Sequence, residues 1–259
     1  MNYWFGSNNL KEIHAAVDAG IKTVWIDLER LGKEERQPLN TRKSNHHVLD
    51  ITKVRREFPK IDILVRVDPI NENSKFQIDQ VIEAGADKIM LPFFRSLQEV
   101  EKFTSYVAGR CSIGLLVETG ASLVRLDRIL NKIKVDFVHL GINDLSIDLK
   151  LDFMFEVFDG WVIDYFAGLC RKHNVKYGIG GVSFLYSGVI PSNLVISELK
   201  RLKCDNAIIS RQFQELARKP KEFKLKFKEL ENYRRSIKQS EIIQNQSAIK
   251  ELIKETTDG

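Results

Sequence analysis

The regular alternation of two kinds of segment constrains the fold more than any other feature of this sequence. Short apolar runs rich in β-branched residues predict eight strands, at 2–6, 23–28, 62–68, 88–93, 112–118, 136–142, 176–182 and 206–211. Segments with helical spacing lie between them, at 9–20, 50–58, 74–85, 96–107, 121–132, 161–173 and 191–202. This order indicates parallel strands joined by helical crossovers. Eight such units favour an α/β fold of the closed (β/α)8 TIM barrel type over an open doubly wound sheet.

The length of the chain fits one such barrel followed by a helical extension. A (β/α)8 barrel takes roughly 250 residues, and this chain has 259 residues, of which 43% are hydrophobic. We expect a barrel domain over residues 1–218 and a basic amphipathic helical tail over residues 219–259. The tail carries an apolar stripe at helical spacing, formed by Phe223, Phe227, Leu230, Tyr233 and Ile237. We expect this stripe to pack on its own barrel or on that of a neighbouring subunit, and so to help form a homo-oligomer.

Charge and composition argue against several classes of protein. The net charge is +5, but nine Lys and Arg residues against three Glu between Arg218 and Lys238 account for all of it. Because no stacking aromatics interleave with these charges, we expect no nucleic-acid partner. No apolar run approaches the roughly 20 residues that span a bilayer, and the first residues do not resemble a signal peptide, so we expect no membrane partner and a cytoplasmic location. The three cysteines form no C-x-x-C pair, and we expect them to be reduced.

Polar residues follow several of the predicted strands where each strand ends. The second strand ends on Asp27 and Glu29, the third on Arg66 and Asp68, the fifth on Glu118, and the sixth on Asn143 and Asp144. In a barrel, catalytic side chains lie at the carboxyl ends of the strands. The sequence therefore predicts an active site to which four strands contribute.

These residue types suit the chemistry of an enolate. Glu118 and Asp144 stand at neighbouring strand ends, and two carboxylates with room left for water are a common way to hold Mg²⁺. Arg66 offers a planar fork for a substrate carboxylate or a developing oxyanion. A metal and an arginine together place positive charge where an enolate accumulates negative charge.

Five motifs in register resemble one known family. They are "WIDLE", "LVRVDPIN", "EAGADKIMLPF", "LLVETG" and "VDFVHLGINDLS". In this order and spacing they are similar to the HpcH/HpaI aldolase and citrate lyase beta-subunit family of the pyruvate/phosphoenolpyruvate superfamily. The resemblance implies a (β/α)8 barrel that makes or breaks carbon–carbon bonds next to a pyruvate or acetyl enolate, with Mg²⁺ or Mn²⁺.

The resemblance also implies roles for individual residues. Glu118 and Asp144 correspond to the metal ligands, and Arg66 to the arginine that stabilises the enolate. We assign Asp27 and Glu29 to catalysis with Arg66. We assign Gly141 and Asn143, which lead into the sixth-strand metal ligand, to substrate binding.

The chain departs from the family pattern beside the second strand. Aldolase members follow the second-strand acid with a histidine that acts as acid–base group, whereas this chain has Arg30. A long polar loop over residues 31–47 follows, and it resembles a subgroup of the family found among bacterial surface-polysaccharide genes. On that resemblance, the substrate would be bound in part by loop residues, namely Lys33, Arg36, Gln37 and His46.

Three functions stay open at the level of sequence. The first is a metal-dependent aldolase, or class II carbon–carbon lyase, acting on a 4-hydroxy-2-oxo acid that could derive from a sugar. The second is a lyase acting on an acyl-CoA or acyl-carrier thioester, as in citrate or citramalyl cleavage. Relatives of that kind often use an added C-terminal segment over the site, and the tail after Lys219 keeps this option open. The third is a catalytically silent barrel that binds a metabolite or a partner protein.

Overall fold

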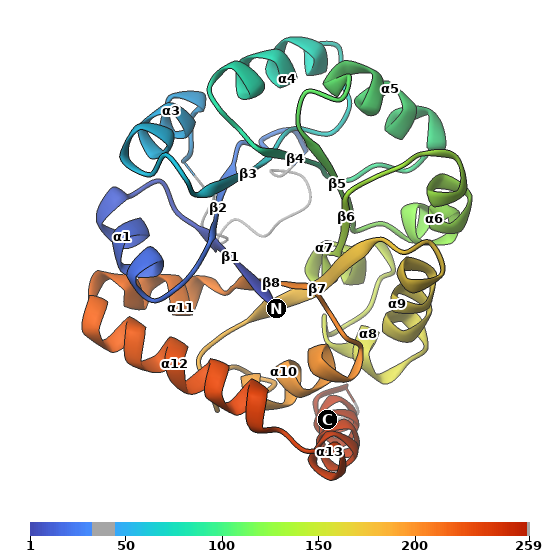
Figure 1. Ribbon diagram of the computed structural model, residues 1–259. Helices are drawn as coiled ribbons and strands as arrows, with labels where there is room; N and C mark the ends of the chain where they lie inside the picture. Colours follow the sequence, from blue (N-terminus) through green and yellow to red (C-terminus); the bar gives the residue numbers. More distant parts are fainter. Residues whose placement is uncertain (33–44, 258–259) are drawn as a thin grey trace.

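Eight parallel strands close into a barrel, seen end-on in Figure 1. The computed structural model describes residues 1–32 and 45–257. Each strand pairs with its neighbours in chain order, and the last pairs with the first. The strands are β1 (Asn2–Gly6), β2 (Thr23–Asp27), β3 (Asp62–Arg66), β4 (Lys88–Leu91), β5 (Ser112–Val117), β6 (Phe137–Leu140), β7 (Lys176–Val182) and β8 (Asn206–Ile209). The predicted (β/α)8 fold is confirmed.

Helices surround the barrel on its outside (Figure 1). All seven predicted helical segments form helices: α1 (Leu10–Asp18), α3 (Val48–Glu57), α4 (Ser74–Glu83), α5 (Leu97–Val107), α6 (Gly120–Lys132), α9 (Val162–Lys172) and α10 (Ser192–Arg201). Local signals set several of their ends. Ser96 and Thr119 cap the first turns of α5 and α6, and Gly20 and Gly85 follow α1 and α4 with φ of +100° and +103°.

The sequence pattern missed two short helices between β6 and β7, and a short helix and a 3₁₀ turn after β8. They are α7 (Ile142–Asp148), α8 (Glu156–Asp159), α11 (Arg211–Glu215) and the 3₁₀ turn η1 (Leu216–Arg218). The expectation that the sixth strand ends on Asn143 and Asp144 was wrong. The strand ends at Leu140, Gly141 is the N-cap of α7, and Asp144 lies in the first turn of that helix. The carboxylate still stands at the carboxyl end of β6, where the chain leaves the barrel.

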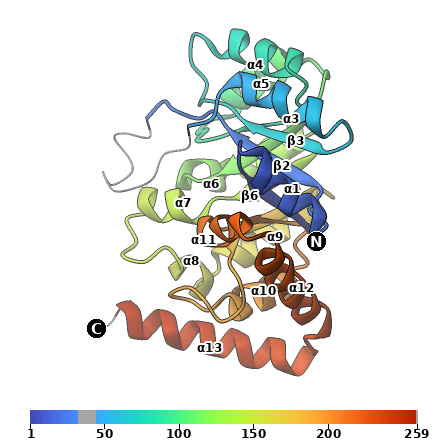
Figure 2. The same cartoon turned by 90° about the vertical axis from the view of Figure 1, so that its left-hand side faces the viewer.

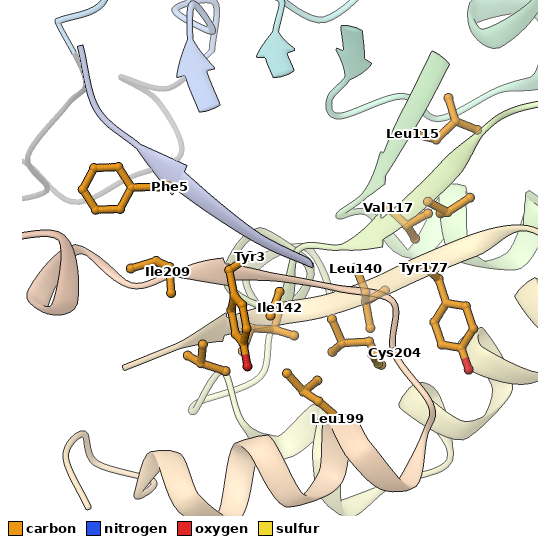
Figure 3. Close-up of a cluster of buried hydrophobic side chains, with 14 of the residues drawn as sticks. Tyr3, Phe5, Leu115, Val117, Leu140, Ile142, Tyr177, Leu199, Cys204 and Ile209 are labelled. Atoms are coloured by element: carbon orange, nitrogen blue, oxygen red, sulfur yellow. The ribbon is translucent and has the colours of Figure 1, made fainter. Parts of the chain in front are cut away.

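Two apolar layers hold the barrel together. Inside it, Trp4, Leu64, Met90, Leu116 and Phe137 form a separate buried cluster. A far larger cluster fills the space between the strands and the outer helices. Figure 3 shows part of this outer layer, with Leu140 of β6 and Leu199 of α10 among its side chains. The barrel is therefore a packed core rather than a channel, and substrate can approach only at its ends.

One histidine belongs to the inner layer. His139 is fully buried in β6, its Nε2 lies 3.0 Å from the carbonyl oxygen of Gly180, and its ring centroid lies 4.9 Å from that of Trp4. Gly178 makes room for this ring, since a Cβ there would stand 2.7 Å from His139 Nδ1. Burial lowers the pKa of His139 to about 4, although its hydrogen bond to Gly180 acts in the opposite direction. His139 is therefore a neutral core residue at pH 7.

The C-terminal segment forms two helices, α12 (Pro220–Ser236) and α13 (Gln239–Thr257). The α12 helix lies in the outer ring between α1 and α10, with Phe223, Phe227 and Leu230 buried against the barrel. The α13 helix runs along the side of the molecule beside α10 and α8 (Figure 2). The predicted amphipathic helix is thus present and packs on its own barrel. The division of the chain at residue 218 and the homo-oligomer remain proposals.

The helices of the described residues include none that is both long enough and apolar enough to cross a membrane.

Candidate active site

Arg66 is the centre of an ion-pair network at the carboxyl ends of β2 and β3. Its Nε and Nη2 donate to Oδ1 and Oδ2 of Asp27, both at 2.9 Å, and its Nη1 lies 3.1 Å from Oε2 of Glu29. Asp27 and Arg66 are opposite each other in the β2–β3 register, so the strand pairing itself places the two groups together. The guanidinium carbon also lies 5.0 Å from the centroid of the Trp25 ring.

The neighbouring carboxylates keep the guanidinium of Arg66 charged. Burial by itself would lower the pKa of the guanidinium, but the negative charges of Asp27 and Glu29, with a smaller effect from Glu118, raise it well above its usual value. A guanidinium has five N–H donors, and the hydrogen bonds to Asp27 use one on Nε and one on Nη2. Within the part of the chain that the structure describes, the hydrogens of Nη1 and the second hydrogen of Nη2 remain for a further acceptor. Arg66 is thus a rigid, permanently charged donor at the barrel mouth.

The two predicted metal ligands are brought to neighbouring strand ends. Glu118 follows β5 and is 2% exposed, and Asp144 follows β6 and is 7% exposed. The backbone N–H of Phe93 donates to Glu118 Oε1 at 3.0 Å, and Asn143 Nδ2 donates to Asp144 Oδ1 at 2.9 Å. Gly141 lies against the glutamate, because a Cβ at this position would stand 3.0 Å from Glu118 Oε2. Two buried carboxylates therefore share the mouth with Arg66.

The donor set fits a hard divalent cation with few protein ligands. Among the residues that the structure describes, no group of three or more His, Cys, Asp and Glu side chains is arranged to hold a metal ion. Mg²⁺ commonly keeps several waters and binds through one or two carboxylates together with the substrate, so a pair of carboxylates is a suitable set. The space that Gly141 leaves beside Glu118 is consistent with such a site.

His46 returns from the loop to the end of β2. Its Nδ1 accepts a hydrogen bond from the backbone N–H of Asp27 at 2.9 Å, and its side chain is buried. An accepting Nδ1 places the proton of the neutral imidazole on Nε2. Arg30 supports this return, because its Nη2 donates to the carbonyl oxygen of His46 at 3.2 Å. The arginine at the family's histidine position thus lies next to a histidine that comes from elsewhere in the chain.

The structure gives less information about the other predicted residues. Lys33, Arg36 and Gln37 lie outside the described residues, so their assignment to substrate binding remains a proposal. Asn143 is exposed at the start of α7. Asp68, which follows β3, accepts the backbone N–H groups of Arg30 and Leu31 at 2.6 and 2.9 Å, and so anchors the start of the loop after β2.

A cavity of about 610 Å³ opens beside Asp144, and the sequence pattern did not point to most of its wall. The wall comes from the loops after β2, β3, β4 and β6, and it contains Arg95, Asp148 and Lys150 besides apolar side chains. A volume of this size is typical of small-molecule sites. The signal in the sequence was weak, since Arg95 and Lys150 lie 55 positions apart and only the fold brings them together.

Solved structures of low sequence identity share the fold. An HpcH/HpaI aldolase from Desulfitobacterium hafniense superposes with a TM-score of 0.59 at 15% identity, covering 81% of this chain and 85% of that one. An HpcH/HpaI aldolase/citrate lyase family protein from Burkholderia cenocepacia gives a TM-score of 0.62 at 14% identity, covering 85% and 91%. Macrophomate synthase gives 0.57 at 16% identity, covering 81% and 76%. At these identities the likeness shows the fold alone.

The sequence itself decides the family. No curated protein sequence matches the chain. The sequence model of one family, described as HpcH/HpaI aldolase/citrate lyase, matches residues 1–156, which is more than half of the chain and includes Arg66, Glu118 and Asp144. The chain therefore belongs to the HpcH/HpaI aldolase/citrate lyase family, a family of aldolases and lyases.

Proposed function

We propose that the protein is a divalent-metal-dependent carbon–carbon lyase of the aldolase type, which acts through a pyruvate-type enolate on a 4-hydroxy-2-oxo acid. The observation that supports this most strongly is that Glu118 acts on the charge of Arg66 and is buried, like Asp144, at the carboxyl ends of neighbouring strands. Glu118 and Asp144 would hold Mg²⁺ or Mn²⁺. When bound, the metal would supply a Lewis acid for the oxygens of the 2-oxo acid.

Arg66 would bind the 2-oxo acid end of the substrate, on the side opposite to the metal. Its N–H groups that do not contact Asp27 and Glu29 would donate to the carboxylate or to the developing enolate oxygen. Asp27 and Glu29 would keep the guanidinium charged and fixed in direction, so that little reorganisation accompanies the reaction. Gly141 and Asn143 would line the path of the substrate at the start of α7.

We also propose that His46, at the end of β2, moves a proton during the reaction. Its neutral ring carries the proton on Nε2, because Nδ1 accepts from Asp27. We therefore place His46 with the substrate-binding residues, where it can exchange a proton with the 4-hydroxyl group.

The thioester-lyase alternative depended on a tail that covers the site. In the structure α12 and α13 lie on the outer ring and along the side of the barrel (Figures 1 and 2). No specific observation therefore favours that alternative over the aldolase.

The test is release of pyruvate from a panel of 4-hydroxy-2-oxo acids, with Mg²⁺ or Mn²⁺ and with a chelator. We expect cleavage of at least one member, abolished by the chelator and by Arg66→Ala. Release that survives the chelator would contradict the metal dependence. Failure across the panel and across citramalyl and citryl thioesters would favour the silent barrel.

A further inference from the structure

The cavity beside Asp144 has a charge distribution of its own. Leu31, Pro69, Ile70 and Ile147 make much of its wall apolar, and Arg95 and Lys150 supply its positive charge. We propose that this cavity binds an anionic group, a carboxylate or a phosphate, at the end of the substrate farthest from the reacting carbons, and that Arg95 and Lys150 are the residues that recognise it. The assignment of this anion to the substrate rests on the proposed function, whereas the binding of an anion does not.

Arg95 is held in a defined position on the cavity wall. Its Nη2 donates to Asp148 Oδ1 at 2.6 Å, and its guanidinium carbon lies 5.1 Å from the centroid of the Phe93 ring. Asp148 is fixed in turn, because its Oδ2 accepts the backbone N–H of Gly120 at 2.8 Å. Within the described residues, Nε and Nη1 of Arg95 have no hydrogen-bond partner. The guanidinium is therefore preorganised and keeps donors for a ligand.

The same wall is connected to the proposed metal site. Phe93, on which Arg95 lies, donates its backbone N–H to Glu118, and its φ is +51°. A non-glycine residue in this left-handed region is uncommon, and such backbone tends to persist where neighbouring groups hold it in place. One short segment after β4 thus contacts the catalytic carboxylate through its backbone and supports a cation in the cavity through its ring.

Lys150 supplies the second positive charge. It follows the C-cap of α7 with φ of +57°, a position at which glycine is the usual residue. Among the residues that the structure covers, no carboxylate lies within ion-pair distance of its Nζ. Lys150 is exposed at the rim, so its charge is available to an anion that enters the cavity.

The acidic groups in the wall do not cancel these charges. Asp148 is bound by Arg95 and by the N–H of Gly120, and Asp144 is only 7% exposed and accepts a hydrogen bond from Asn143 Nδ2. An incoming carboxylate or phosphate would therefore meet Lys150 and the remaining donors of Arg95. A substrate with a 2-oxo acid at one end and an anion at the other would lie along the apolar part of the cavity wall.

The test measures anion binding to the metal-free protein, which requires no turnover. Inorganic phosphate and succinate are titrated by calorimetry into wild type, Lys150→Gly and Arg95→Gln. Lys203→Gly is the matched control, since Lys203 is also exposed, also follows a helix C-cap, and has φ of +59°. It lies between α10 and β8, at the opposite end of the barrel. We expect Lys150→Gly and Arg95→Gln to weaken binding roughly tenfold, and Lys203→Gly to bind as wild type does.

The two probes also distinguish a phosphate group from a carboxylate group on the substrate. Tighter binding of phosphate would indicate a phosphorylated substrate, and tighter binding of succinate a dicarboxylic one. No binding to wild type, or equal binding by Lys150→Gly, Arg95→Gln and wild type, would overturn the proposal. Thermal melts of each variant exclude misfolding as the cause of a loss.

A kinetic experiment tests whether the cavity binds part of the substrate during the reaction. For aldol addition of pyruvate, Lys150→Gly should raise KM for succinic semialdehyde but not for butanal, a neutral acceptor of the same length. Anion binding without any pyruvate chemistry would leave the cavity assignment standing and contradict only the proposed function. Pyruvate chemistry with equal KM changes for both aldehydes would contradict the cavity assignment alone.

Discussion

Arg66 faces Asp27 across the β2–β3 pair, and the two side chains form a bidentate ion pair with both donor–acceptor distances at 2.9 Å. The side chains of both residues are 12% exposed, so this pair is largely shielded from water. An arginine in that position can stabilise the fold or bind substrate. Substitution would lower stability in the first case and turnover in the second.

Arg66→Lys separates these roles. Lysine keeps the charge but loses the planar fork, so at least one hydrogen bond to a charged group is lost. Such a loss costs about 1.5–3 kcal/mol, and turnover should fall roughly 10- to 100-fold. The control is Arg201→Lys, because Arg201 likewise forms a bidentate pair with one acid, Asp164, and contacts a second, Glu198, away from the mouth. Both variants should lose similar stability in urea unfolding, and only Arg66→Lys should lose turnover. Full activity in Arg66→Lys would show that the assignment is wrong.

Gly141→Ala tests the space beside Glu118. A Cβ there would stand 3.0 Å from Glu118 Oε2 and 3.2 Å from Glu118 Cβ, while the φ of Gly141 is −86°, which alanine adopts without strain. The glutamate must therefore shift, and we expect Mn²⁺ affinity and turnover to fall roughly tenfold with little change in melting temperature. Gly168→Ala is the control, since no atom lies within 4 Å of its added Cβ. Unchanged Mn²⁺ affinity in Gly141→Ala would contradict the placement of the metal at Glu118.

The alternation of apolar and helical segments predicted the strands and seven helices because each of them buries one regular face. The α7 helix escaped this reasoning. It begins directly after β6, so the apolar residues Leu140 and Ile142 read as one continuous strand. The pairing of Arg66 with Asp27 was not foreseen either, because it depends on the register between two strands.

The path of a loop was even less accessible to sequence reasoning. His46 could be named as a candidate only by resemblance, and its hydrogen bond with the backbone of Asp27 depends on how the chain returns to β2. Arg95 and Lys150 come from different loops, and each resembles an ordinary surface charge until the cavity is seen. Hydrophobic periodicity shows which face of one helix or strand is buried, whereas these sites form where several loops come together in the folded chain.

The tail should be required for folding. Phe223 packs on Phe5 and Phe213, with ring centroids 5.7 and 5.2 Å apart, and Phe227 packs on Tyr3 at 5.1 Å. Loss of one buried phenylalanine costs about 3–5 kcal/mol, against a total stability of about 5–15 kcal/mol. A chain that ends at residue 218 should therefore fail to show a cooperative thermal transition. A stable residue 1–218 fragment would contradict this and support an independent barrel domain.

The oligomer is a separate question for the same helices. We expect light scattering on the full chain to give a mass above the monomer mass of 29.9 kDa. A monomer at all concentrations would show that α12 serves its own barrel alone.

His139 should make the fold sensitive to acid. Burial lowers its pKa from 6.5 to about 4, so the folded state favours the neutral ring while the unfolded chain binds a proton below about pH 6.5. Stability should fall as the pH drops from 6.5 to 4, by about 3 kcal/mol from this group. In urea unfolding at pH 7 and pH 4.5, His139→Gln should lose less stability between the two pH values than wild type does. His14→Gln is the control for the same substitution at an exposed histidine. An equal pH dependence in His139→Gln and wild type would argue against a neutral buried ring.

The metal pair is the central claim, and calorimetry of Mn²⁺ binding tests it most directly. Glu118→Gln and Asp144→Asn keep the shape of each side chain and remove one negative charge. Glu198→Gln is the control, because Glu198 is a carboxylate equally buried at 1% exposure that pairs with Arg201 outside the mouth. We expect wild type and Glu198→Gln to bind one Mn²⁺ with the same affinity, and Glu118→Gln and Asp144→Asn to bind it at least tenfold more weakly while they remain folded. Equal affinity in all four proteins, or no binding in wild type, would contradict the metal site and with it the enolate mechanism.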